Sequence, residues 1–232
     1  MCEEESNGFR VRQYTFGKEV SEDDEDERSE LVVFIPEILN SQYGTYVWPS
    51  AVVLAQYVWF HRRELTGKKV LEIGAGASLP GVVAAKCGAE VILSDHAELP
   101  QCLENCRQSC QMNGILGVPV TGFTWGDISP DLLAQPPLDI ILGSDVFYEP
   151  EDFEDVLSSV YFLMEKNSKA QFWTSYQVRS ANWSIEDLLY KWDLKCVHVP
   201  LITFHGHSPH LAGSELPGRH TVQMMIITAK GT

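Results

Sequence analysis

A glycine-rich segment that follows an apolar run is the strongest chemical signal in the sequence. Residues 70–81 read VLEIGAGASLPG, which predicts a strand, a tight turn and the start of a helix. Glycines allow a sharp turn and bring the backbone close to a ligand. The dinucleotide fingerprint G-x-G-x-x-G fits Gly74 and Gly76 but fails at Leu79, where the third glycine lets helix and strand pack closely. Glu72, two residues before the first glycine, suits a cationic ligand better than a pyrophosphate.

Asp95 is a second acid at a spacing that suits a ligand. It follows Gly74 by 21 residues and ends the next apolar run. An acid at the tip of the second strand can accept hydrogen bonds from both hydroxyls of a ribose. The alternative is that Asp95 caps a helix beginning near Ala97, but its pairing with the glycine-rich turn favours the ribose. S-adenosylmethionine meets both requirements, because it has a ribose, an ammonium and a sulfonium but no phosphate.

The elements that must position these residues alternate along the chain. We expect strands over residues 69–73, 90–94, 118–125, 138–144, 170–175, 196–201 and 221–229. We expect helices over residues 49–63, 80–87, 97–113, 150–166 and 183–192. Repeated strand–helix units predict a parallel sheet covered by helices on both faces. The last two strands have no helix between them, so we expect one antiparallel strand at an edge.

The N-terminal part has a different character. Short strands are predicted over residues 9–16 and 31–35, and six consecutive acids lie between them at 22–27. Because like charges repel, this run predicts a solvated loop, with docking of a basic partner as the less favoured alternative. We therefore expect N-terminal strands and an acidic loop over 1–46, followed by one α/β domain over 47–232.

The charge and the cysteines narrow the function classes. The 232 residues include 32 acids and 17 bases, a net charge of −15, which disfavours a nucleic-acid substrate and favours a cationic protein partner. No apolar run approaches the roughly 18 residues that span a bilayer, and the acidic start is unlike a secretory signal. The six cysteines do not form spaced pairs, which predicts a reducing compartment, the cytoplasm or the nucleus.

Three of the cysteines share one face of a predicted helix. Cys102, Cys106 and Cys110 follow one another at intervals of four residues. Thiols at this spacing on one straight helix do not converge on a tetrahedral zinc ion. We expect small buried apolar side chains and no metal site.

Five segments in order resemble the family 16 branch of the seven-β-strand methyltransferases. They are GTYVWP at 44–49, EIGAG at 72–76, SD at 94–95, TWG at 124–126 and DIILGSDVFY at 139–148. The resemblance covers roughly residues 40–230. It implies a Rossmann-like α/β fold whose seven-stranded sheet is mostly parallel with one antiparallel edge strand, preceded by a short N-terminal extension. It also implies S-adenosylmethionine as the cofactor.

The resemblance assigns cofactor contacts to matching positions. Trp48 is implied to pack near the methionine end and Trp125 against the adenine, where an aromatic face stacks on a base. Plain core packing is the alternative for each tryptophan. Asp95 is implied to hold the ribose, and Ser144 is a small residue before the catalytic acid. The expected cofactor-binding residues are Trp48, Glu72, Gly74, Ala75, Gly76, Asp95, Trp125 and Ser144.

The resemblance also implies that Asp145 and Tyr148 are catalytic and serve the methyl acceptor. Methyl transfer from a sulfonium is an in-line displacement that depends mostly on positioning. A lysine acceptor needs roughly 4 kcal/mol to deprotonate at neutral pH. Asp145 can orient the amine, Tyr148 can hydrogen-bond it, and Glu149 can add a second carboxylate. The alternative is that Asp145 caps a turn and Tyr148 covers the end of the sheet.

Together these features predict an S-adenosylmethionine-dependent methyltransferase that acts on a basic side chain of a protein. The resemblance implies a lysine or arginine acceptor, with histone tails among the expected substrates. Arginine enzymes use two glutamates after the fourth strand, whereas this chain has Asp145 and Glu149, so the acceptor stays open. The alternatives are a non-catalytic, cofactor-binding scaffold and a small-molecule methyltransferase. We expect a monomer that can join a chaperone or nuclear complex and that contacts neither nucleic acid nor membrane.

Overall fold

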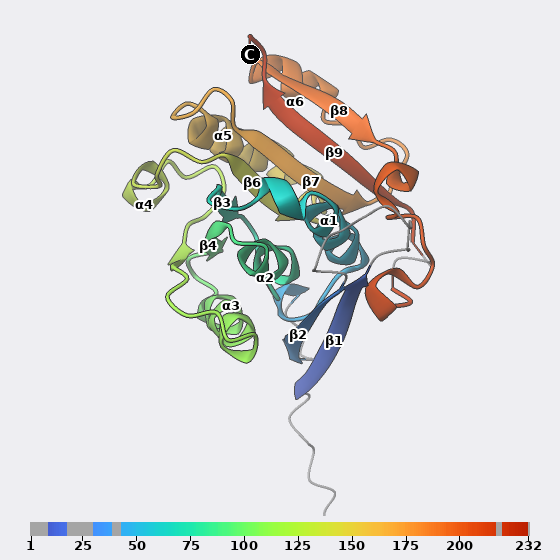
Figure 1. Ribbon diagram of the computed structural model, residues 1–232. Helices are drawn as coiled ribbons and strands as arrows, with labels where there is room; N and C mark the ends of the chain where they lie inside the picture. Colours follow the sequence, from blue (N-terminus) through green and yellow to red (C-terminus); the bar gives the residue numbers. More distant parts are fainter. Residues whose placement is uncertain (1–8, 18–29, 39–42, 217–219, 232) are drawn as a thin grey trace, which may run out of the picture.

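The computed structural model describes residues 9–17, 30–38, 43–216 and 220–231 (Figure 1). The acidic run at 22–27 lies outside these residues. Within them, no helix is both long enough and apolar enough to cross a membrane.

A seven-stranded sheet with the order β5-β4-β3-β6-β7-β9-β8 forms the centre of the fold. Its strands are β3 (Lys69–Glu72), β4 (Glu90–Asp95), β5 (Val120–Gly122), β6 (Ile140–Ser144), β7 (Gln171–Gln177), β8 (Leu194–Val199) and β9 (Val222–Ala229). β3 pairs in parallel with β4 and β6, whereas β9 is antiparallel to both β7 and β8. The predicted Rossmann-like, mostly parallel sheet with one antiparallel strand is therefore confirmed. The antiparallel strand, β9, lies one position inside the edge strand β8, because the last segment returns to pair with β7 as well.

Helices cover both faces of this sheet, with α1, α2 and α3 on one face and α5 and α6 on the other (Figure 1). The helices are α1 (Pro49–Phe60), α2 (Leu79–Lys86), α3 (Pro100–Met112), α4 (Pro130–Leu133), α5 (Phe153–Met164) and α6 (Glu186–Lys191). Successive strand residues point to opposite faces. In β3, Val70 joins the hydrophobic cluster formed with α1 and α2, while Leu71 joins the cluster formed with α5.

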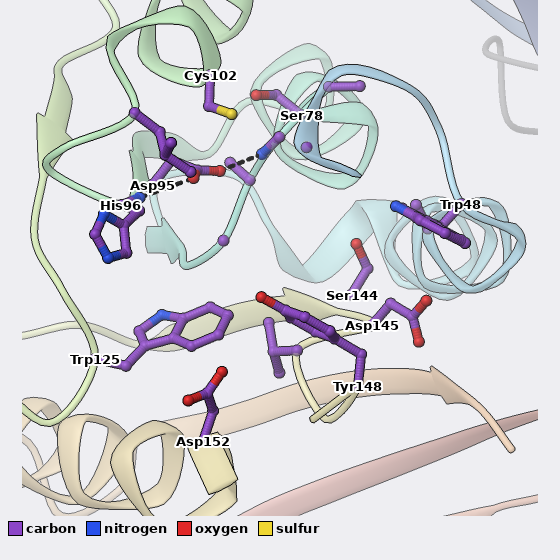
Figure 2. Close-up of a pocket in the computed structure, with 18 of the residues that line it drawn as sticks. Trp48, Ser78, Asp95, His96, Cys102, Trp125, Ser144, Asp145, Tyr148 and Asp152 are labelled. Carbon is purple, nitrogen blue, oxygen red and sulfur yellow. Dashed lines mark hydrogen bonds between the residues drawn. The ribbon is translucent and has the colours of Figure 1, made fainter. Parts of the chain in front are cut away.

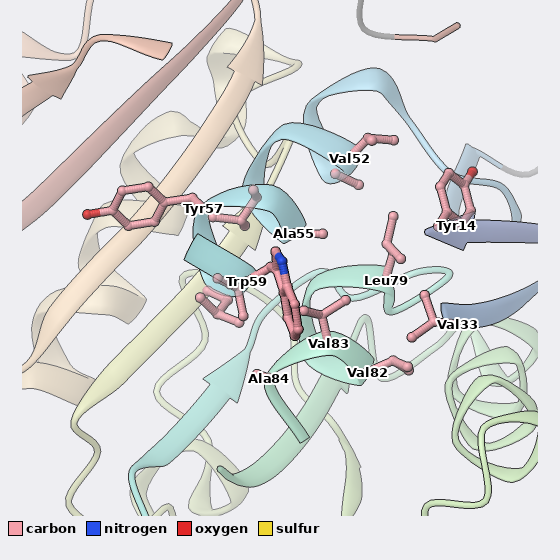
Figure 3. Packing of buried hydrophobic residues seen from close by; sticks show 14 of the residues in the cluster. Tyr14, Val33, Val52, Ala55, Tyr57, Trp59, Leu79, Val82, Val83 and Ala84 are labelled. Atoms are coloured by element: carbon pink, nitrogen blue, oxygen red, sulfur yellow. The ribbon is translucent and has the colours of Figure 1, made fainter. Parts of the chain in front are cut away.

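The N-terminal strands pair with each other and not with the central sheet. The two strands were predicted but their pairing was not, and in the structure β1 (Phe9–Gly17) and β2 (Glu30–Ile38) form an antiparallel hairpin. Its buried side chains, including Tyr14 and Val33, pack in the same cluster as Val52 and Leu79 from α1 and α2 (Figure 3). The hairpin thus shares a core with the helices of the sheet, and the division at residues 46 and 47 stays a prediction.

Several predicted elements are shorter in the structure. The helix expected from residue 97 begins at Pro100, because proline is well accommodated in a first helical turn. The strand expected over 118–125 is limited to β5. Its pairing with β4 ends where Asp95 lies opposite Gly122, because Asp95 is the last residue of β4. The helix expected over 183–192 is limited to α6. The short helix α4 was not expected, although Ser129 caps it by accepting a hydrogen bond from the Leu132 N–H at 3.2 Å.

Candidate active site

A cavity of about 670 Å³ opens at the carboxyl ends of β3, β4 and β6. Open α/β sheets bind their ligands at this edge. Every expected site residue except Glu72 lines the cavity (Figure 2). These residues are Trp48, Gly74, Ala75, Gly76, Asp95, Trp125, Ser144, Asp145 and Tyr148. Trp48 and Trp125 are both partly exposed there, which favours a role in the site over plain core packing.

The glycine-rich turn between β3 and α2 needs glycine for two separate reasons. Gly74 and Gly76 have φ angles of +57° and +52°, which L side chains rarely adopt. There is also no room for a side chain. A Cβ on Gly76 would lie 2.7 Å from the carbonyl oxygen of Gly44, and one on Gly74 would lie 2.7 Å from the Trp125 ring. The turn therefore packs closely against the backbone of Gly44 on one side and the Trp125 ring on the other.

Asp95, the last residue of β4, holds this turn in place. Its Oδ2 accepts a hydrogen bond from the Gly76 N–H at 2.7 Å, and its Oδ1 accepts one from the His96 N–H at 2.8 Å (Figure 2). Burial raises the pKa of this carboxyl, and the two backbone N–H groups oppose that rise. Asp95 does not cap the following helix, so that alternative is wrong. Its carboxylate lines the cavity and keeps acceptor capacity for a ligand.

Glu72 lies behind the turn and not in the cavity. It is fully buried, and its Oε2 accepts a hydrogen bond from the N–H of Gly81 in α2 at 2.9 Å. Its Oε1 has no hydrogen-bond partner among the described residues. Burial raises the pKa of this carboxyl to about 8. The expectation that Glu72 contacts the cofactor is therefore corrected, because its side chain packs under α2 and positions the backbone.

Trp125 is positioned by α5. The N–H of the next residue, Gly126, donates to the Ser159 hydroxyl at 2.9 Å. The Trp125 ring meets the Tyr148 ring edge-on, with centroids 6.5 Å apart. The two rings line the cavity together, and Trp125 offers an aromatic face of the kind that stacks on a base.

Asp145 is held by an arginine that the sequence analysis missed. The residue follows β6 with a φ of +56°, and its side chain is only 4% exposed. Its Oδ1 accepts hydrogen bonds from the Gln177 N–H at 3.0 Å and from Arg179 Nη1 at 2.9 Å, while its Oδ2 accepts one from Arg179 Nη2 at 2.7 Å. Three N–H donors therefore hold this carboxylate, and its expected role in orienting an acceptor nitrogen stays a prediction.

Tyr148 and the acids after it remain available to a ligand. The Tyr148 hydroxyl makes no hydrogen bond to the described residues, and its side chain is about one-third exposed. Burial, with nearby acids, raises the pKa of this phenol. Glu149 and Asp152 also line the cavity and form no ion pair within the part of the chain that the structure describes. Burial, with Asp155 and Glu151 nearby, raises the pKa of Asp152.

The wall opposite these acids is tied to the N-terminal hairpin. The Val47 N–H donates to Oε1 of the buried Glu37 at 2.9 Å, and Arg12 Nε donates to Glu37 Oε2 at 2.6 Å. The Thr45 hydroxyl donates to the Ile38 carbonyl at 2.7 Å. The hairpin thus supports the segment that leads to Trp48.

The cysteines of α3 are buried, as expected. Cys102 lines the cavity, and burial raises the pKa of its thiol to about 12, so the thiol stays protonated at neutral pH. Cys106 donates to the Gly76 carbonyl, with the sulfur 3.6 Å from the oxygen. Among the described residues, no three histidine, cysteine or acidic side chains are grouped so as to hold a metal ion.

The donor set around the cavity fits S-adenosylmethionine. Asp95 suits a ribose, Trp125 suits an adenine, and acids suit the ammonium and sulfonium charges. A phosphate-bearing dinucleotide fits poorly, because the described residues of the lining include five acids and one permanent cation. The acids are Asp95, Asp145, Glu149, Asp152 and Asp155, and the cation is Arg179.

Comparison with known proteins points the same way. The model of a family described as lysine methyltransferase matches residues 27–185. The chain is 65% identical to the histone-arginine methyltransferase METTL23 of Xenopus laevis, over 98% of this chain and 96% of that one. It is 69% identical to the human protein of the same name, over 79% and 96%. It is 36% identical to the protein N-lysine methyltransferase METTL21A of Danio rerio, over 50% and 54%.

Solved structures share the fold at low sequence identity. A methyltransferase from Agrobacterium tumefaciens superposes with a TM-score of 0.57 at 15% identity, over 85% of this chain and 67% of that one. The magnesium protoporphyrin IX methyltransferase of Synechocystis, solved with S-adenosylmethionine bound, gives a TM-score of 0.51 at 16% identity, over 79% and 80%.

Proposed function

The chain belongs to the lysine methyltransferase family, family 16 of the seven-β-strand methyltransferases, and on that premise we propose that it methylates an arginine side chain of a histone. S-adenosylmethionine is the methyl donor. The Xenopus laevis and human relatives named as histone-arginine methyltransferases match 98% and 79% of the chain at 65% and 69% identity, whereas the N-lysine relative matches 50% of it at 36% identity. This difference supports arginine over lysine as the acceptor.

The cofactor, when bound, supplies a methyl group on a sulfonium; a nitrogen nucleophile would attack that methyl carbon, and S-adenosylhomocysteine would leave as the thioether. On this proposal Asp95 binds the ribose, Trp125 packs against the adenine, and the backbone of residues 74–76 approaches the cofactor closely. Asp95 can do this without reorganisation, because two backbone N–H groups already orient its carboxylate. The site is thus set before the ligand arrives, which lowers the entropic cost of binding.

Glu149 and Asp152 carry the acceptor part of the proposal. A guanidinium stays protonated at neutral pH, so the acceptor arrives charged and must be held by carboxylates that can also accept its proton. Both side chains line the cavity, and the raised pKa of Asp152 makes it a stronger base than an ordinary aspartate. The Tyr148 hydroxyl can accept a hydrogen bond from the same guanidinium. Asp145 is not assigned to the acceptor, because Arg179 already occupies it.

The charge of the chain supports a basic protein substrate. The net charge is −15, and acids line the cavity on the side that follows β6. A histone tail carries many lysines and arginines, so it would be attracted toward this side at low ionic strength. The same field disfavours a nucleic acid in the cavity.

Methyl transfer to purified histones tests the proposal. We expect labelled methyl groups on arginine, located by mass spectrometry, and at least a tenfold loss of transfer in Glu149→Gln with unchanged cofactor affinity. Glu151→Gln is the matched control, because this exposed acid belongs to the same segment but does not line the cavity. Methylation of lysine alone would contradict the arginine proposal and would agree with the description of the family as lysine methyltransferases. Intact cofactor binding without transfer to any protein would favour a scaffold, and transfer in protein-free extract would favour a small-molecule acceptor.

The cellular setting of the protein is also a proposal. We infer a monomer that acts in the cytoplasm and the nucleus and can join a chaperone or nuclear complex. Histones are nuclear proteins, and the cysteines at 87, 102, 106, 110 and 196 are free thiols, as is usual in a reducing compartment. Localisation of the tagged chain and its mass in solution test these points.

A further inference from the structure

Arg179 is a charged residue of the cavity that has no role in the reaction described so far. We propose that Arg179 binds the carboxylate of the methionine part of S-adenosylmethionine, and that Asp145 holds Arg179 in position for it. The inference rests on the proposed function only for the identity of the cofactor. It makes Arg179 a ligand-binding residue and Asp145 its positioning residue.

The hydrogen bonds of Arg179 leave one edge of its guanidinium free. The group carries five N–H bonds on a rigid plane. Nη1 donates to Asp145 Oδ1 at 2.9 Å and to the Gln177 carbonyl at 3.2 Å, and Nη2 donates to Asp145 Oδ2 at 2.7 Å. The Nε–H and the second Nη2–H make no hydrogen bond to any described residue. These two N–H groups lie on one edge of the plane, and such an edge matches a second carboxylate in a bidentate pair.

The charges of the cavity give a carboxylate no other partner. Besides Asp145, the lining acids are Asp95, Glu149, Asp152 and Asp155. These side chains stabilise an ammonium or a sulfonium but repel a carboxylate. Arg179 is the only lysine or arginine among the described residues that line the cavity. Arg179 is therefore the permanent positive charge of this lining that can pair with the carboxylate of a ligand carrying both kinds of charge.

The two ends of the cavity fit the two parts of the cofactor. Asp95 and Trp125 lie at one end, and Asp145 and Trp48 lie at the other (Figure 2). If the ribose and adenine occupy the first end, the amino-acid part extends toward the second. Arg179 belongs to that second end, because it is paired with Asp145 and its Cζ lies 5.8 Å from the centre of the Trp48 ring.

Asp145 gives Arg179 a fixed support. Its side chain is 4% exposed, whereas that of Arg179 is 25% exposed and open to a ligand. The Gln177 N–H fixes the Asp145 carboxylate independently of Arg179. A guanidinium held in this way loses little side-chain freedom when a ligand binds.

Calorimetry with two ligands that differ only in the carboxylate tests the inference. The ligands are S-adenosylmethionine and its decarboxylated form, titrated into the parent chain and into Arg179→Gln. We expect Arg179→Gln to weaken S-adenosylmethionine at least tenfold and the decarboxylated ligand less than twofold. Arg179→Lys, which keeps the charge but not the fork, should give an intermediate loss. Arg107→Gln is the matched control, because Arg107 is an exposed arginine outside the cavity that pairs with Glu104.

A second variant separates binding from damage to the fold. Arg179→Gln leaves the Asp145 carboxylate without its partner, so the double variant Asp145→Asn/Arg179→Gln is titrated as well. We expect the double variant, like Arg179→Gln, to lose the preference of the parent chain for S-adenosylmethionine over the decarboxylated ligand. Equal weakening of both ligands, or no weakening of either, would overturn the inference. A parent chain that binds neither ligand would overturn the cofactor assignment and, with it, the proposed function. A parent chain that binds both, with Arg179→Gln unaffected, overturns only the role of Arg179.

Discussion

The Asp95 carboxylate and the backbone N–H of Gly76 are joined by a hydrogen bond of 2.7 Å, so the acid at the end of β4 and the turn after β3 hold each other. The proposed ribose ligand and the shape of the glycine-rich turn therefore depend on the same side chain. A change at Asp95 acts on binding directly and on the turn indirectly, and an experiment must separate the two effects.

Asp95→Ala should weaken S-adenosylhomocysteine by roughly 1.5–3 kcal/mol, because a charge-assisted hydrogen-bond acceptor is lost. It should also lower stability by about 1 kcal/mol, since the Gly76 N–H loses its partner. Asp95→Asn keeps one oxygen for Gly76 and should recover most of the stability but not the affinity. Calorimetry and thermal denaturation of the same samples measure both effects, with the exposed Asp127→Ala as control. Unchanged affinity in Asp95→Ala would reject the ribose assignment.

Gly76→Ala should cost more stability than Gly114→Ala. Both glycines have positive φ angles, +52° and +65°, so both variants pay the backbone cost of about 1 kcal/mol. A Cβ on Gly114 meets nothing within 4 Å, whereas one on Gly76 would lie 2.7 Å from the Gly44 carbonyl oxygen. The difference between the two free energies of unfolding isolates this contact. Equal losses would show that the turn and the Gly44 segment do not press on each other.

Glu72→Gln should flatten the dependence of stability on pH. Burial raises the pKa of Glu72 from 4.5 to about 8. Between these values the folded chain binds more protons than the unfolded chain, so the free energy of unfolding falls as the pH rises. Glu72→Gln removes this contribution, and its melting temperature should fall less than that of the parent between pH 5 and pH 8. Glu90→Gln changes an exposed carboxyl and should keep the parental slope. Parallel curves for Glu72→Gln and the parent would contradict the buried, protonated state.

Asp145→Asn should lower cofactor affinity along with stability. The substitution removes the negative charge that holds Arg179, and leaving this partly exposed guanidinium without its charged hydrogen-bond partner costs roughly 1–3 kcal/mol. We expect a lower melting temperature and about three- to tenfold weaker S-adenosylmethionine. If the variant keeps full affinity and loses only methyl transfer, Asp145 contacts the acceptor after all.

Tyr148→Phe should slow methyl transfer about tenfold, which is about 1.4 kcal/mol of barrier. Cofactor affinity and melting temperature should stay unchanged, because the hydroxyl has no hydrogen bond to lose among the described residues. Single-turnover transfer to a histone peptide measures the loss. Tyr190→Phe, on a side chain that is 80% exposed and outside the cavity, is the control. Full activity in Tyr148→Phe would remove the phenol from the reaction.

Local spacing was enough to predict the turn at Gly74–Gly76 and the acid at Asp95, because both lie at the ends of neighbouring parallel strands. Alternation of strands and helices likewise predicted the central sheet. The position of β9 between β7 and β8 was harder to foresee, since it depends on which strand edge the last segment pairs with. The spacing of apolar residues indicates that the last segment is a strand, but it does not indicate which strand edge that segment pairs with.

The pairing of Asp145 with Arg179 could not be read from spacing. The two residues are 34 positions apart, and only the adjacency of β6 and β7 brings them together. Knowledge of strand order was the missing signal, because Arg179 lies just past the carboxyl end of β7. Glu72 shows the complementary limit. Glu72 is close to the glycines along the chain, which favoured a contact with the ligand. Its side chain instead packs beneath α2, where Gly81 leaves space for it, and sequence spacing does not reveal that direction.

The hydrogen bond from the Val47 N–H to Glu37 couples the N-terminal hairpin to the segment of the cavity wall that leads to Trp48. Any ligand that orders the Trp48 segment must, by thermodynamic linkage, also favour the folded hairpin. Amide hydrogens of β1 and β2 should therefore exchange more slowly when the cavity is filled, although no described residue of these strands lines it. The same linkage implies that changes at the Arg12–Glu37 pair tune ligand affinity from outside the site.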